Sequence, residues 1–188
     1  MSSGESDAAL VQRARQGSKE AFGQLVVRYR GLVVAVAYRM TGSAATAEDV
    51  AQVVFLRAWM QLASLHDAAA FRGWLYRLAV SASIDQLRRS PQALPLAESQ
   101  VGDTVHPEGE TLARERAQAV RHAVLALPNH CRAALALREF EGLSYKETSQ
   151  VLDIPVGTVM SRLNYARTLM RAALGAHLSP PGRRPVEE

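Results

Sequence analysis

Apolar residues recur at every third or fourth position along most of this 188-residue chain. This spacing places them on one face of an α-helix, and no segment shows the apolar and polar alternation of a half-buried strand. The clearest run lies in a predicted helix that starts at Ser18 and ends at residues 41–43. Its apolar face comprises Phe22, Leu25, Tyr29, Leu32, Val36 and Met40. The sequence therefore predicts an all-α fold.

Three further helices are expected before residue 90. One runs through Arg15 with Asp7 as its N-cap, and another opens at the capping pattern 46–49 (Thr-Ala-Glu-Asp). The apolar set of that second helix is Val50, Val54, Leu56, Trp59 and Leu62. A loop over 65–70 then leads to a helix over about 71–89.

The helical pattern stops at residues 91–110. This stretch holds prolines and glycines, and its charged residues are all acidic: Glu98, Asp103, Glu108 and Glu110. It is longer than most loops inside a compact domain. We therefore predict two small helical domains, 7–90 and 111–175, joined by a flexible acidic linker over 91–110. The N-terminus 1–6 and the tail 176–188 are expected to be disordered.

The second domain is predicted to be a four-helix domain that contains a helix-turn-helix. Helices are expected from Thr111, from Pro128 to residues 141–142, over 144–152 and from 155 to about 174. Residues 144–147 (Ser-Tyr-Lys-Glu) form a capping box before the short helix. Asp153 suits the left-handed turn that follows.

The last helix has an apolar side, which would pack on its neighbours, and a polar side. The apolar side comprises Val156, Val159, Leu163, Ala166 and Met170, and the polar side comprises Thr158, Ser161, Arg162 and Tyr165. A polar side of this kind suits the DNA major groove, where hydroxyls bind phosphates and arginine binds phosphate or guanine. The alternative is an ordinary helical hairpin with a solvated polar face.

Composition excludes several other classes. The chain carries a net charge of +4, nearly all of its cations are arginines, and Cys131 is its single cysteine. Its N-terminus lacks a signal-peptide pattern, and the longest apolar stretch, 32–38, is too short to span a bilayer. We expect a soluble cytoplasmic protein without membrane contact of its own.

Catalytic or metal-binding side chains are scarce. The nearest candidates are His122, His130 and Cys131, which lack metal-ligand spacing, and no glycine-rich phosphate loop occurs. The sequence predicts no enzyme, no metal and no cofactor.

Three motifs together resemble the extracytoplasmic-function (ECF) sigma factors of the sigma-70 family, over about residues 8–174. Residues 47–59 (AEDVAQVVFLRAW) resemble the polymerase-binding helix of that family. Residues 71–79 (FRGWLYRLA), with 85 and 87–89, resemble its promoter-melting helix. Residues 127–128, 132, 141–147 (EGLSYKE), 154–163 (IPVGTVMSRL) and 166–167 resemble its C-terminal DNA-binding domain.

The resemblance implies a subunit that binds core RNA polymerase, through its β and β′ subunits, and directs initiation at the −10 and −35 promoter elements. Implied polymerase-binding residues are Glu48, Asp49, Gln52 and Phe55. Implied −10 contacts are His66, Asp67, Phe71, Arg72, Trp74, Arg77, Ser81, Arg88 and Arg89, although Trp74 also suits a core position. Implied −35 contacts are Thr158, Met160, Ser161, Arg162, Tyr165 and Arg167. The linker would either thread the RNA exit channel, where its carboxylates mimic RNA phosphate, or serve only as a soluble tether. An anti-sigma factor is a further possible partner.

The chain departs from the family pattern at four positions: Val53, Ser81, Met160 and Tyr165. The last two stand where the family favours lysine or arginine, so −35 recognition is expected to be unusual or weak. The competing hypothesis is a one-component helix-turn-helix regulator that binds its operator without polymerase.

Overall fold

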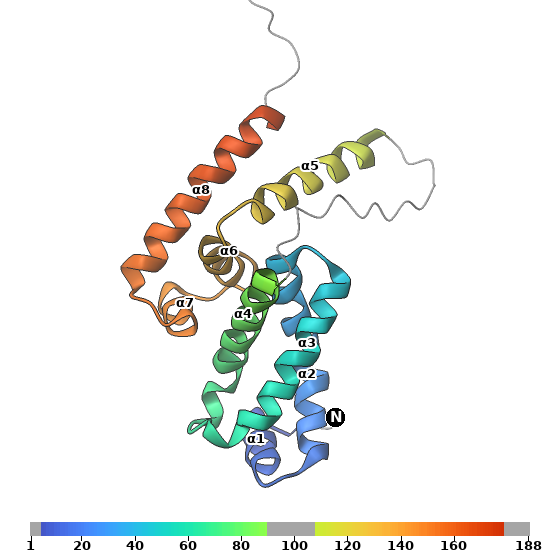
Figure 1. The fold of residues 1–188 in the computed structure, drawn as a ribbon, viewed down its shortest axis with the longest axis vertical. Coiled ribbons are helices and arrows are strands. Elements are labelled where there is room, and N and C mark those ends of the chain that lie inside the picture. The colour runs from blue at the N-terminus through green and yellow to red at the C-terminus, as the bar shows by residue number, and fades with distance from the viewer. Residues whose placement is uncertain (1–4, 90–107, 179–188) are drawn as a thin grey trace, which may run out of the picture.

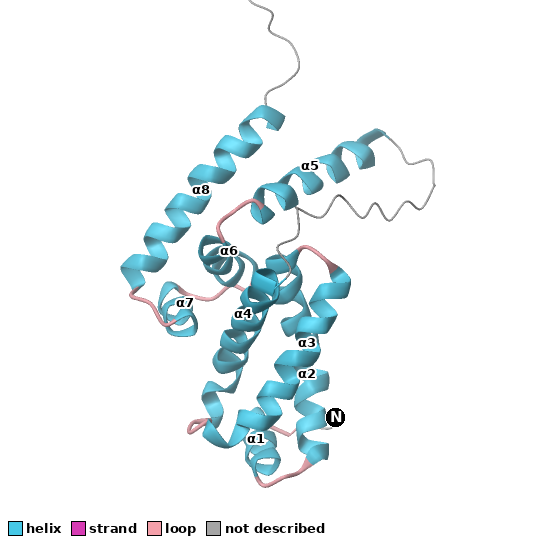
Figure 2. Ribbon diagram, in the orientation of Figure 1, coloured by secondary structure: helices cyan, strands magenta, loops and turns pink. Residues whose placement is uncertain are grey.

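The computed structural model describes residues 5–89 and 108–178, and all regular structure in these two ranges is helical (Figures 1 and 2). The all-α prediction is confirmed. The N-terminal half contains α1 (Asp7–Arg15), α2 (Lys19–Thr41), α3 (Ala44–Gln61), the short turns η1 (Leu62–Ser64) and η2 (Ala68–Ala70), and α4 (Phe71–Arg89). The C-terminal half contains α5 (Glu108–Leu125), α6 (Asn129–Leu135), the π-helical turn η3 (Ala136–Phe140), α7 (Tyr145–Leu152) and α8 (Val156–Leu178).

Serine side chains cap the first three helices. The hydroxyls of Ser6, Ser18 and Ser43 each accept a backbone N–H from three residues further on. Such a cap satisfies an N–H group that has no partner inside the helix. The predicted start of the second helix at Ser18 is confirmed. The predicted caps at Asp7 and Thr46 are wrong, because Asp7 lies inside α1 and Thr46 lies inside α3.

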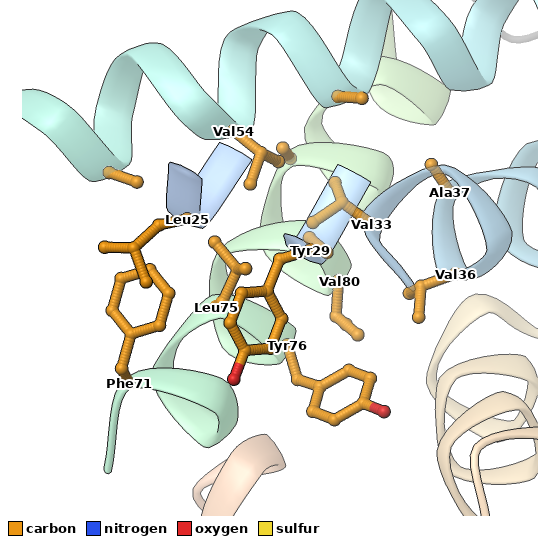
Figure 3. Close-up of a cluster of buried hydrophobic side chains, with 14 of the residues drawn as sticks. Leu25, Tyr29, Val33, Val36, Ala37, Val54, Phe71, Leu75, Tyr76 and Val80 are labelled. Carbon is orange, nitrogen blue, oxygen red and sulfur yellow. The ribbon is translucent and has the colours of Figure 1, made fainter. Parts of the chain in front are cut away.

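A single apolar cluster fills the space between α2, α3 and α4 (Figure 3). Leu25, Tyr29 and Leu75 are buried there, and the rings of Tyr29 and Phe71 meet edge-on at 5.4 Å. The expected burial of Leu56 is wrong, because this side chain is 61% exposed. One side of α3 thus presents apolar surface to solvent.

The C-terminal half has a smaller core between α5, α6 and α8. It comprises Val124, Leu127, Cys131, Ala134, Leu135, Val159, Leu163 and Ala166. The predicted helix-turn-helix is present as α7 and α8. The Ser144 hydroxyl accepts from the Glu147 N–H, and the Glu147 carboxylate accepts from the Ser144 N–H at 2.8 Å. Asp153 has φ 53° in the turn, which is the left-handed conformation expected of it.

Two predicted boundaries differ from the observed ones. α5 begins at Glu108, so the last three residues of the predicted linker are helical. α8 extends to Leu178, so the first three residues of the predicted tail are helical as well. The rest of the linker, the tail and most of the predicted N-terminal segment lie outside the described residues.

The left-handed residue between α7 and α8 makes a testable prediction. Asp153 is exposed, and its backbone conformation costs a residue with a Cβ atom about 1 kcal/mol relative to glycine. We expect Asp153→Gly to raise the free energy of unfolding by about 0.5–1 kcal/mol in urea denaturation. Asp153→Ala serves as the control, and an equal gain from alanine would contradict this explanation.

The two halves pack directly on each other. α7 contacts α4, while α5, α6 and η3 contact the C-terminal part of α2 (Figure 1). Four side chains of the C-terminal half belong to the apolar cluster of the N-terminal half: Ala133, Leu137, Leu143 and Val151. The two predicted domains therefore share the larger of the two hydrophobic clusters in this structure.

Candidate nucleic-acid interface

Four large apolar side chains of α2 and α3 are exposed, and we call this set the α2–α3 patch (Val27, Val53, Leu56 and Met60). Two contacts show how these helices align. The rings of Phe22 and Trp59 lie 5.0 Å apart, and Arg30 binds Glu48 at 2.7 Å. Val27 lies between these contacts along α2. Large apolar side chains that stay exposed on neighbouring helices commonly mark an interaction site.

The predicted polymerase-binding residues adjoin this patch. Asp49 and Gln52 are exposed, Glu48 is half-buried and paired with Arg30, and Phe55 is half-buried against the core. Sequence reasoning missed the patch itself. The sequence of α3 did contain a signal for it. Leu56 and Met60 are apolar and four positions apart, so they share a face, and that face points to solvent when Val50 and Val54 are buried.

A second surface lies on α4 and the segment that precedes it. Five predicted −10 residues of α4 are exposed: Arg72, Arg77, Ser81, Arg88 and Arg89. His66 and Asp67 are exposed before η2, and Asp67 caps that turn by accepting the Ala69 N–H at 2.8 Å. The structure thus brings seven of the predicted −10 residues to the protein surface.

The two aromatic candidates on α4 lie differently. Phe71 is 1% exposed and its ring belongs to the core, so in this structure it offers no surface for the predicted DNA contact, which stays a prediction. Trp74 is half-buried and packs 5.9 Å from Phe71. The sequence did not reveal the burial of Phe71, because a residue at a helix start has few neighbours in sequence that show which side it faces.

A cavity of about 600 Å³ lies beside the contact between α4 and α7 and is lined by residues of both helices. Arg72, Trp74 and Arg77 line one side, and Glu141 and Glu147 line the other. A hydrogen bond to the Tyr76 hydroxyl at 3.3 Å raises the pKa of Arg72, which therefore stays cationic. Predicted DNA-contacting residues thus face carboxylates of the C-terminal half.

The third surface is the outward side of α8. Ser161 is exposed, Thr158 and Arg162 are half-buried, and Met160 and Tyr165 are 50% and 53% exposed. Arg167 is half-buried and pairs with Glu139 at 2.9 Å. The predicted apolar side is confirmed for its central members, whereas Val156 is exposed. All six predicted −35 residues are therefore at least partly accessible on one helix.

The described residues offer little for catalysis. Cys131 is buried, and burial raises the pKa of its thiol, which disfavours the reactive thiolate. No group of three His, Cys, Asp or Glu side chains within residues 5–89 and 108–178 is placed to hold a metal ion. None of the described helices has the length and apolar character needed to cross a membrane.

A bundle of helices joined to an exposed helix-turn-helix is an arrangement found in DNA-binding proteins. Two family models match the chain: Sigma-70 region 2 over residues 25–91, and Sigma-70, region 4 over residues 117–170. The RNA polymerase sigma-H factor of Pseudomonas aeruginosa is 37% identical over 182 residues, which cover 90% of this chain and 94% of that protein. The ECF RNA polymerase sigma factor SigW of Bacillus subtilis is 30% identical over 176 residues, 87% of this chain and 94% of SigW.

The solved structure of CnrH in complex with the cytosolic domain of CnrY superposes with a TM-score of 0.68 at 29% identity, over 92% of this chain and 99% of CnrH. The chain belongs to the sigma-70 family, as an ECF-type sigma factor. It binds core RNA polymerase and directs promoter-specific transcription initiation.

Proposed function

We propose that the three surfaces divide this function among them. The α2–α3 patch, with Glu48, Asp49 and Gln52 at its polar end, docks on core polymerase. The exposed arginines of α4 hold the backbone of the −10 strand. The outward side of α8 enters the −35 major groove. One observation carries the proposal. Each surface is exposed, and its helix lies within or overlaps the segment whose sequence resembles the family's segment for that function.

The polymerase surface combines two kinds of contact. Asp49 and Gln52 offer oxygen acceptors to basic side chains, while Leu56 and Met60 offer apolar area. Interfaces commonly place such apolar side chains at the centre and polar groups at the rim. A role in polymerase binding therefore accounts for the exposure of large apolar side chains on α3.

The −35 surface of this chain is unusually apolar. Met160 and Tyr165 replace the lysine or arginine that the family favours, so fewer phosphate or guanine contacts are available. Apolar side chains contact the methyl group of thymine in the major groove. We propose that this protein reads a −35 element with thymine opposite these two residues and relies on Arg162 for its polar contact.

The partners of the chain and its cellular compartment follow from the same proposal. The chain acts in the cytoplasm with polymerase, and its role is binding rather than catalysis. CnrH was solved with the cytosolic domain of CnrY, and a Bartonella quintana RpoE with the anti-sigma factor NepR at 21% identity to this chain. We propose that an anti-sigma factor restrains this protein as well.

Reconstitution with core polymerase tests the proposal as a whole. The purified chain is mixed with core enzyme, and transcript 5′ ends are mapped on genomic DNA. We expect start sites that share one pair of promoter elements. A chain that binds duplex DNA tightly without polymerase, and fails to direct initiation with it, would instead be a one-component regulator.

The Arg162 contact makes a separate prediction. We expect Arg162→Ala to weaken holoenzyme binding to a mapped promoter duplex by about 1–3 kcal/mol, because its guanidinium is the main polar donor on the α8 surface. The measurement is fluorescence anisotropy at fixed salt. Arg171→Ala, on the same helix and exposed, is the matched control. Equal affinities for the two variants would remove the role assigned to Arg162.

A further inference from the structure

A cleft of about 310 Å³ is lined by α4 together with residues of α6, α7 and α8. Three of its lining residues are apolar and buried: Val80, Ala133 and Val151. Its charged side chains are exposed or half-buried. The cleft therefore combines an apolar floor with a charged rim. Small-molecule sites in proteins share this composition, and their volumes begin at roughly 300 Å³.

Arginines from two helices supply the positive charge of the rim. Arg77 and Arg88 lie on one face of α4, because three helical turns of about 3.6 residues separate them. Arg162 comes from α8. Arg77 donates to the Gln150 carbonyl of α7, a contact that orients its guanidinium and uses one of its five N–H donors. The planar fork of each guanidinium matches the oxygen atoms of a phosphate group.

These cations have little counter-charge. Among the described residues that line the cleft, Asp85 alone is acidic, and its carboxylate accepts from two nitrogens of Arg57 on α3, both at 3.2 Å. Within residues 5–89 and 108–178, neither Arg88 nor Arg162 forms a hydrogen bond or an ion pair. Like charges that share a cleft raise the local positive potential, and an anion bound between them lowers it.

The balance of charge favours phosphate as the bound group. A phosphate group carries nearly two negative charges at neutral pH and three acceptor oxygens, whereas a carboxylate carries one charge. A short chain of phosphates can therefore neutralise Arg77, Arg88 and Arg162 together within a small volume. The apolar floor leaves room for an uncharged part of the ligand, such as a nucleobase, beside Val80 and Val151.

We propose that this cleft binds a short phosphate chain, carried either by a nucleoside triphosphate or by inorganic triphosphate. Arg77, Arg88 and Arg162 hold the phosphate oxygens, and the site is complete only where α4 and α8 line it together. The same three arginines are proposed DNA contacts, so a bound triphosphate would compete with promoter DNA for them. This competition rests on the proposed function, whereas binding of the triphosphate does not.

Isothermal titration calorimetry on the full-length chain tests the site, with inorganic triphosphate as the probe in magnesium-free buffer. Arg88→Gln and Arg162→Gln each remove one cation from the rim. Their matched controls are Arg89→Gln and Arg171→Gln, which remove the same charge from exposed positions on the same two helices outside the cleft. Because Arg88 and Arg162 have no partner among the described residues, their replacement breaks no contact that holds the fold.

We expect Arg88→Gln and Arg162→Gln each to weaken triphosphate binding by about 5- to 10-fold, as loss of a hydrogen bond to a charged group does. Arg89→Gln and Arg171→Gln should leave the affinity unchanged. Arg162→Lys should recover part of the loss, because it keeps the charge without the planar fork. Triphosphate at ten times its Kd should raise the Tm of the wild-type chain by about 3–5 °C.

Two further ligands define the chemistry of the site. Tighter binding of ATP or GTP than of inorganic triphosphate would identify a nucleotide as the ligand, and equal binding would identify the phosphate chain alone. Citrate, which carries three carboxylates, is the anion control and should bind at least about 10-fold more weakly.

The absence of triphosphate binding at about 1 mM would overturn the proposal. Equal weakening by Arg88→Gln and Arg89→Gln would also overturn it, because net charge would then account for the binding, and so would equal affinities for citrate and triphosphate. These titrations contain neither polymerase nor DNA. Failure of the proposed function would instead appear as a chain that binds triphosphate but does not direct initiation with core polymerase, so the two failures are distinguishable.

Discussion

Replacing Arg132 with alanine is expected to lower the free energy of unfolding by roughly 2–4 kcal/mol. Arg132 is 7% exposed on α6, and its guanidinium donates to the carbonyls of Met40, Leu125 and Leu127. Burial lowers the pKa of this arginine, which expresses the cost of holding a cation away from water. Alanine would leave three buried carbonyl groups without their donor, and it would leave a cavity where the side chain stood.

The measurement is equilibrium unfolding in urea, followed by circular dichroism. Arg167→Ala is the matched control, because Arg167 forms an ion pair with Glu139 at the surface, which we expect to contribute less than about 1 kcal/mol. Arg132→Lys should recover only part of the loss, since one ammonium group lacks the planar fork that reaches several carbonyls. Similar losses for Arg132→Ala and Arg167→Ala would show that the carbonyl network contributes little.

Reversing the charge of Asp49 is expected to weaken association with core polymerase by at least about 100-fold, or 2.7 kcal/mol. Asp49 is exposed at the polar end of the α2–α3 patch. Asp49→Lys would set a cation against the basic polymerase side chains that we propose it meets. Leu56→Ala, in the apolar part of the patch, should weaken binding by about 10-fold or more, as expected for a central interface residue.

Surface plasmon resonance with immobilised core enzyme gives both affinities. Glu115→Lys is the control, because Glu115 is exposed on α5 in the C-terminal half and its replacement changes the net charge equally. A complex that survives Asp49→Lys would place the docking surface elsewhere. Equal weakening by Asp49→Lys and Glu115→Lys would reduce the effect to net charge.

Local sequence signals predicted the local structure well. The Ser144 capping box and the left-handed Asp153 depend on residues within a few positions, so the sequence alone identified both. The cap at Ser43 was missed because Thr46 carries an equally suitable hydroxyl nearby. The capping residue is the one at which the chain turns from α2 into α3. The position of this turn depends on how α2 packs against α3.

The sequence predicted which residues of each helix belong to a site. It did not predict which of these residues are exposed or how the sites are arranged relative to one another. Helical spacing predicts which residues share a face, yet α3 has apolar residues on two sides, and only tertiary packing decides that Val54 is buried and Leu56 exposed. The contact between Arg39 and Glu141 joins positions 102 apart in sequence. No local pattern encodes such a pair, so the packing of the two halves on each other could not be predicted.

The shared core has a consequence for handling the protein. Whenever the halves separate, Leu143 and Val151 leave the apolar cluster that buries them and meet water. Molecules whose halves have separated would aggregate through these exposed apolar side chains. Each half produced without the other would be in that condition permanently, so the isolated halves should be less soluble than the intact protein.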